Sequence, residues 1–144
     1  MQRRIILMRH GHAEERPDDY VRPLSDAGRA AVVRAGTALT GTGWLPDHVL
    51  TSSAPRALET TELVAKACGH RGPIRGDRAL YLAGEGRYLA ALQHLPARAR
   101  CVLMVGHNPG LSALARQLFQ HERDMAPAEY VSALFDLDEW SELS

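Results

Sequence analysis

The 144-residue sequence predicts an α/β fold, a three-layer sandwich in which helices flank a mostly parallel central sheet. Short, continuous apolar runs such as IILM (5–8) and CVLMV (101–105) are typical of strands that are buried on both faces. Longer stretches between these runs carry apolar residues at helical spacing. Strands and helices alternate without a repeat or a linker, so we expect a single domain over residues 1–144.

The first expected elements are a strand at the IILM run and a helix after it. The helix is predicted to begin after Ser25, a residue type that caps helix N-termini, and to end near Gly41. The segment Asp47–Thr51 is short and apolar in its centre, which indicates a second strand. A strand, a helix and a strand in this order are typical of a parallel sheet.

The next helix follows the second strand closely. Ser53 is its expected N-cap, Pro55 is tolerated in its first turn, and Gly69 is expected to close it. Residues 70–79 then form a loop, with a possible short strand at Ile74. The second helix is therefore expected to start within a few residues of a strand end.

The C-terminal half repeats the alternation. Leucines at helical spacing predict a helix over roughly 84–95, and the run CVLMV predicts the most deeply buried strand. A turn leads into a helix over roughly 109–119, Val131–Leu137 is the last predicted strand, and Trp140 is expected to anchor the tail.

Composition excludes several classes of partner. Seventeen basic residues balance seventeen acidic ones, whereas nucleic-acid and membrane-surface binders usually carry a basic excess. No segment approaches the roughly 20 apolar residues of a membrane span. Cys68 and Cys101 lack a metal-binding spacing and are expected to be buried and reduced, which favours a cytoplasmic location.

Polar segments follow three of the predicted strands. The first strand leads into Arg9, His10 and Gly11, the second into a segment that ends at Arg56, and the most apolar strand into a turn that contains His107. Ligands of α/β sheets bind outside the carboxyl ends of the strands. Two of these segments also run into helix N-termini, which attract anions. Arginine, imidazole and helix dipole together predict a phosphate pocket.

These motifs, in this order, resemble those of the histidine phosphatase superfamily, which is also called phosphoglycerate-mutase-like. LMRHGHA carries the Arg-His-Gly hallmark at the end of the first strand, SSAPRALETTELV the later arginine, and VGHNPGL the second histidine. The resemblance covers residues 3 to about 119. It implies a three-layer α/β fold and phosphoryl-transfer chemistry.

A finer resemblance is to the small SixA-like branch, the phosphohistidine phosphatases. DDYVRPLSDAG is similar to that branch's segment before the first helix, whose arginine contacts phosphate and corresponds to Arg22. Residues 69–100 leave little room for the lid of larger relatives, and an open site suits a phosphorylated protein. The resemblance therefore implies dephosphorylation of phosphohistidine on a protein and makes a mutase a poorer fit.

The resemblance also implies roles for individual residues. His10 is the expected nucleophile and would form a covalent phosphohistidine intermediate. The phosphate is expected to be bound by Arg9, Gly11, Arg22, Arg56, His107 and Asn108, although Asn108 also suits a helix cap. Phosphoryl transfer depends chiefly on positioning and electrostatic stabilisation, so this set of groups implies no cofactor.

The leaving group decides whether a proton donor is needed. An alkoxide must be protonated as it departs, whereas imidazole, with a pKa near ~6.5, is a far weaker base. Asp19 is the preferred donor in the sequence, and Glu85 fits less well. An enzyme without a dedicated acid is an equal alternative.

Other functions remain open at the level of sequence. A phosphatase for small-molecule or serine-type phosphomonoesters would need Asp19 as its acid, and a phosphate-recognition module would bind without turnover. A third alternative is a pocket for an unrelated anion such as sulfate. His10, His12 and His107 offer three imidazoles, as some zinc sites do, but no carboxylate or thiolate completes the set. We therefore expect no metal site.

Overall fold

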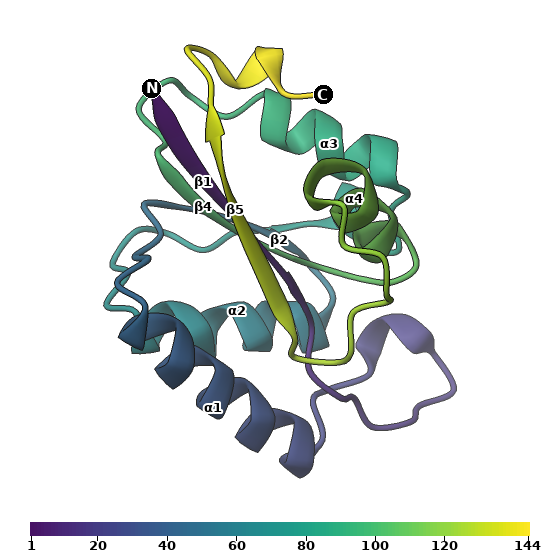
Figure 1. Ribbon diagram of the computed structural model, residues 1–144. Coiled ribbons are helices and arrows are strands. Elements are labelled where there is room, and N and C mark those ends of the chain that lie inside the picture. The colour runs from purple at the N-terminus through teal and green to yellow at the C-terminus, as the bar shows by residue number, and fades with distance from the viewer.

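The computed structural model describes all 144 residues and has the three predicted layers (Figure 1). The strands are β1 (Gln2–Arg9), β2 (His48–Ser52), β3 (Gly76–Asp77), β4 (Cys101–Gly106) and β5 (Tyr130–Asp136). They form one sheet in the order β3-β2-β4-β1-β5. Neighbouring strands are parallel except for β5, which pairs antiparallel with β1 at one edge. The prediction of an α/β fold with a mostly parallel sheet is confirmed.

Two helices cover each face of the sheet (Figure 1). One face packs against α1 (Asp26–Gly41) and α2 (Pro55–Ala67), the other against α3 (Glu85–Gln93) and α4 (Gly110–Phe119). Side chains alternate along β1, so Ile6 contributes to the cluster under α1 and α2, and Ile5 to the cluster under α3 and α4. Because both faces are covered, the middle of β1 (5–8) and the run 101–105 of β4 are continuously apolar.

Three short 3-10 helices complete the fold: η1 (Asp19–Val21), η2 (Arg78–Leu80) and η3 (Trp140–Glu142). Trp140 anchors the tail as predicted, because it is 1% exposed and donates from Nε1 to the Ala99 carbonyl at 3.0 Å. Beside it, Arg3 is fully buried and donates to four backbone carbonyls. None of the helices combines the length and apolarity that crossing a membrane requires.

Of the two helix caps that the sequence predicts, one is confirmed and the other is wrong. Ser25 caps α1 as predicted and accepts from the Gly28 backbone N–H at 2.9 Å. The prediction that Ser53 caps α2 is wrong, because Ala54 occupies the N-cap position and no side chain bonds the first turn. The proline at the start of α2 removes one of the N–H groups that a cap would satisfy. The Ser53 hydroxyl bonds Tyr20 instead, at 2.6 Å.

Two smaller predictions also need correction. The short strand expected at Ile74 lies at β3, which pairs with β2 only through its two residues. The backbone segments at Gly76 and Ser53 approach each other closely there. A Cβ on residue 76 would lie 2.5 Å from Ser53 Cα, and glycine permits this approach because it has no Cβ. Cys68 is buried as expected, whereas Cys101 is only partly buried, and both thiols are free.

Candidate active site

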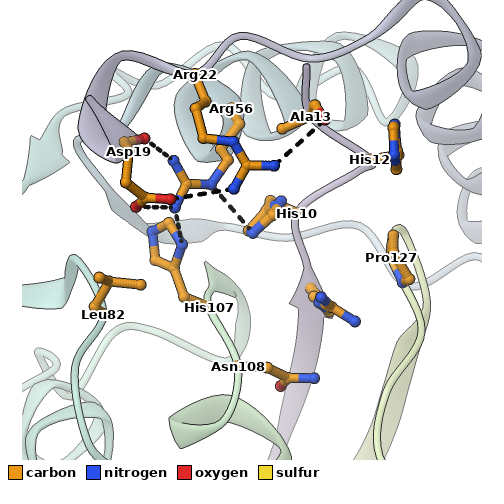
Figure 2. A pocket seen from close by; sticks show the side chains of 11 residues that line it. His10, His12, Ala13, Asp19, Arg22, Arg56, Leu82, His107, Asn108 and Pro127 are labelled. Atoms are coloured by element: carbon orange, nitrogen blue, oxygen red, sulfur yellow. Dashed lines mark hydrogen bonds and ion pairs between the residues drawn. The ribbon is translucent and has the colours of Figure 1, made fainter. Parts of the chain in front are cut away.

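The register of the sheet brings the two predicted histidines together. β1 and β4 are adjacent, and Arg9 pairs with Gly106. The following residues, His10 and His107, therefore leave the sheet at the same level, and their ring centroids are 5.0 Å apart. Arg56, in the first turn of α2, reaches both rings (Figure 2). The three strand-end segments thus meet at one edge of the sheet.

The imidazole of His10 is oriented by the backbone. Its Nδ1 lies 2.7 Å from the Gly11 carbonyl oxygen, which can only accept, so Nδ1 carries the proton and Nε2 keeps a lone pair. Burial, helped by the charges of Arg56 and Arg9, lowers the pKa of His10 to about 4 despite that hydrogen bond. His10 is therefore neutral at pH 7, as a nucleophile must be.

Arg56 is 2% exposed and presents one edge of its guanidinium to the histidines. Its Nε donates to His10 Nε2, and its Nη2 lies beside His107 Nδ1, each at 3.4 Å. These two nitrogens form a fork that matches two oxygens of a phosphate. Both contacts are long for hydrogen bonds, so an incoming phosphate can replace them at low cost.

His107 is held from two sides by residues that the sequence did not single out for this role. Its Nε2 lies 2.8 Å from Ser52 Oγ, and its backbone N–H donates to the Tyr88 hydroxyl at 2.9 Å. That hydroxyl in turn donates to the Leu80 carbonyl at 2.9 Å. Burial, with the nearby charges of His10 and Arg56, lowers the pKa of His107 to about 3.

Two further arginines line the same pocket. Arg9 donates from Nη1 to the Met125 carbonyl at 2.9 Å, while its buried Nε has no partner, and burial lowers its pKa. Arg22 donates from Nε to the Glu14 carbonyl at 2.9 Å and from Nη1 to Asp19 at 3.1 Å. The structure therefore places all three predicted arginines around the two histidines.

Asp19 is the one acidic side chain that lines the pocket. Its Oδ2 accepts from the Tyr81 hydroxyl at 2.5 Å and from Arg56 Nη2 at 2.9 Å, and its Oδ1 accepts from Arg22. These hydrogen bonds, led by that from Tyr81, hold the pKa of Asp19 well below its usual range. An ionised carboxylate has no proton to donate, so this arrangement favours an enzyme without a dedicated acid.

Other residues expected at the site lie at its margin. Gly11 does not line the pocket, and its N–H donates to Thr60 Oγ1 at 3.1 Å. Asn108 does line it, but its Oδ1 accepts from the Ser112 N–H in the first turn of α4 at 3.1 Å, although Pro109 occupies the N-cap position. His12 turns to Ser25 Oγ, 2.8 Å away, and no three metal-ligating side chains gather anywhere in the structure.

The resulting cavity is strongly polar and has a volume of about 260 Å³. Its lining residues are Arg9, His10, His12, Ala13, Asp19, Arg22, Arg56, Leu82, His107, Asn108 and Pro127. Three arginines and one carboxylate leave an excess of positive charge, which suits a phosphate dianion. A neutral imidazole beside fixed cations is chemically able to attack the phosphorus of a bound phosphate.

Comparisons with known proteins agree with this geometry. Residues 5–81 match the family described as the histidine phosphatase superfamily (branch 1). An uncharacterized chloroplastic protein of Arabidopsis thaliana is 40% identical over 130 residues, an alignment that covers 82% of this chain. The chain spans only 60% of that protein's length.

Solved structures resemble this chain over nearly its whole length. A protein from Nakamurella multipartitia, provisionally described as the phosphohistidine phosphatase SixA, is 28% identical with a TM-score of 0.78, covering 99% of this chain and 90% of its own. The protein histidine phosphatase SixA complexed with tungstate is 25% identical with a TM-score of 0.81, covering 90% of this chain and 86% of its own. The family match spans more than half of the residues and includes Arg9, His10 and Arg56. The chain therefore belongs to the histidine phosphatase superfamily, branch 1.

Proposed function

We propose that this protein is a phosphatase that hydrolyses the N–P bond of phosphohistidine on a protein substrate. The observation that carries the proposal is the lone pair on His10 Nε2, which faces the fork of Arg56 in a pocket with excess positive charge. A nucleophile and a phosphate-binding fork in contact are the minimum that phosphoryl transfer to an enzyme requires.

The reaction has two steps. In the first, His10 Nε2 attacks phosphorus while the substrate's N–P bond breaks and its electron pair stays on the departing nitrogen. In the second, water attacks the phosphorus on His10, one of its protons leaves to solvent, and His10 and inorganic phosphate are released. Arg9, Arg22 and Arg56 hold the phosphate oxygens and offset their charge in both steps, with His107 alongside them.

Two observations support phosphohistidine over an ester. The ionised Asp19 has no proton for an alkoxide, whereas an imidazole can depart without one. The cavity of about 260 Å³ lies below the roughly 300–1,000 Å³ that is usual for small-molecule sites. That volume fits a phosphorylated side chain presented by a folded partner. The solved relative named a protein histidine phosphatase supports the same substrate class.

Rapid-quench labelling tests the proposal. The protein is mixed with a radiolabelled, histidine-phosphorylated protein, and the label that becomes attached is tested for stability. We expect an acid-labile, base-stable label on His10 that is absent from His10→Ala and retained in His94→Ala, because His94 is exposed at the end of α3 and does not line the pocket. Turnover by His10→Ala, or wild-type turnover without any attached label, would overturn the mechanism.

A further inference from the structure

A carboxylate stands in a pocket that is otherwise suited to an anion. Asp19 Oδ2 is bound to Nη2 of Arg56, one of the two nitrogens in the fork that would hold phosphate. Two negative charges a few ångströms apart repel each other, so Asp19 lowers the affinity of this site for phosphate itself. A favourable contact between Asp19 and another part of the substrate would offset that cost.

The geometry indicates which part of the substrate Asp19 meets. Asp19 and His10 lie on opposite sides of the Arg56 guanidinium (Figure 2), with His10 near Nε and Asp19 near Nη2. A phosphoryl group held by this edge has His10 on the Nε side, and Asp19 and His107 on the Nη2 side. In-line displacement places the leaving group opposite the nucleophile. The leaving group therefore departs toward Asp19.

The surroundings of Asp19 suit a flat ring with a polar edge. The Tyr81 hydroxyl fixes the carboxylate, and the Tyr81 ring stands edge-on to His107 with 5.4 Å between centroids. Leu82 follows Tyr81, lines the same pocket as Asp19 and is 53% exposed, so it gives that pocket an apolar surface. An imidazole ring can pack on Leu82 while its N–H donates to Asp19, whereas the oxygen of a phosphate ester has no hydrogen to donate.

We propose that Asp19, supported by Tyr81 and Leu82, forms a leaving-group subsite that selects a protonated imidazole; this rests on the proposed function. As the bond from His10 Nε2 to phosphorus forms, the substrate's N–P bond breaks and its electron pair moves to the departing nitrogen. The other ring nitrogen keeps its proton and donates it in a hydrogen bond to Asp19. A neutral imidazole leaves, and no proton is transferred in this step.

Four groups face Asp19 and determine how the subsite responds to pH. They are Arg22 at the end of η1, Arg56 on α2, Tyr81 after η2 and His107 after β4. The hydrogen bonds from Tyr81 and the arginines keep the pKa of Asp19 low, so it is ionised wherever the substrate ring is protonated. Its charge raises the pKa of the bound phosphoimidazole and so extends N–P cleavage to higher pH.

Asp19→Asn, compared with the wild-type protein on two substrates, tests the subsite. One substrate is a phosphohistidine peptide and the other is p-nitrophenyl phosphate, whose leaving group departs as an anion. The ratio of kcat/KM for the peptide to that for the ester is expected to fall about 10- to 100-fold, the equivalent of a hydrogen bond to a charged group. Affinity for inorganic phosphate is expected to rise, and the high-pH limb of peptide cleavage is expected to shift to lower pH.

Glu15→Gln is the matched control, because Glu15 also contacts Arg22, at 3.3 Å, but does not line the pocket. Its substrate ratio should equal that of the wild-type protein. Asp19→Glu keeps the charge and is the second variant. Its ratio of kcat/KM for the peptide to that for the ester is expected to be higher than the ratio of Asp19→Asn. Far-UV circular dichroism checks that each variant folds.

Three outcomes would overturn the subsite. Equal losses on both substrates together with weaker phosphate binding would mean that Asp19 only positions Arg22 and Arg56. A larger loss on the ester would mean that it is a general acid. If the ratio of kcat/KM for the peptide to that for the ester were equal in Asp19→Asn and Asp19→Glu, the charge of residue 19 would have no role in the selection. Failure of the wild-type protein to cleave phosphohistidine would instead refute the proposed function, so the two ideas fail separately.

Discussion

Arg56 and His10 are joined by one long hydrogen bond, 3.4 Å from the guanidinium Nε to the imidazole Nε2. The bond leaves the imidazole lone pair and the guanidinium edge weakly engaged, and both face the same cavity. A phosphate that enters the cavity exchanges this weak contact for shorter, charge-assisted hydrogen bonds. The same hydrogen bond thus holds the His10 lone pair and the Arg56 fork next to each other, where both can engage a phosphate.

Replacing Arg56 by lysine is expected to lower kcat about 10²- to 10³-fold, the cost of removing one preorganised donor. Lysine keeps the charge but cannot bond two oxygens with a planar fork. Steady-state kinetics measure the effect. Arg29→Lys is the control, because Arg29 pairs with Glu59 on α2 away from the pocket. Near wild-type activity in Arg56→Lys would show that charge alone is sufficient.

The stability of the fold should depend on pH through the two buried histidines. Their pKa values in the folded state are about 4 for His10 and about 3 for His107, below the usual ~6.5. The unfolded chain therefore binds more protons between these values, so stability is complete above about pH 6.5 and falls as pH drops, by about 1.4 kcal/mol per pH unit for each histidine. Urea unfolding at pH 7 and pH 5 measures this difference. His10→Gln should show a smaller difference, and an unchanged one would contradict the lowered pKa of His10.

Ser52→Ala tests how His107 is oriented. The Ser52 hydroxyl accepts from one ring nitrogen of His107 and so leaves the other nitrogen, Nδ1, directed at Arg56. Without it the ring can rotate, and kcat/KM is expected to fall roughly tenfold, the equivalent of about one hydrogen bond. Ser53→Ala is the matched control, since that hydroxyl bonds Tyr20. Equal kcat/KM values for Ser52→Ala and Ser53→Ala would show that Ser52 does not orient His107.

Tyr88→Phe should destabilise the fold as well as the site. The Tyr88 hydroxyl is fully buried, and its loss leaves the His107 N–H and the Leu80 carbonyl unpaired. The expected loss is about 1–3 kcal/mol in the free energy of unfolding, measured by urea denaturation. Tyr130→Phe, a partly buried tyrosine on β5, is the comparison, and a loss no greater than in that variant would contradict the bridging role.

The sequence was informative where local pattern determines structure. Continuous apolar runs predicted buried parallel strands, and the carboxyl ends of such strands share one edge of the sheet. His10, Arg56 and His107 follow three such strands, so the sequence alone predicts that they lie together. The predicted cap of α2 was wrong, because α2 begins with a proline and the Ser53 hydroxyl bonds the nearby Tyr20. The sequence did not indicate that Arg3 is buried, because the carbonyls to which it donates belong to segments far away along the chain.

The sequence by itself determined the order of the elements and the residue types that reach the sheet edge, because apolar periodicity and turn residues act over short stretches of chain. Only the tertiary structure decided the protonation and orientation of those residues. Ser52 and Tyr88 orient His107 from 55 and 19 residues away, and Tyr81 reaches Asp19 across 62 residues. Hydrogen bonds and burial of this kind depend on distances in the folded chain. They are what hold the pKa of Asp19, the carboxylate that the sequence offered as a proton donor, below its usual range.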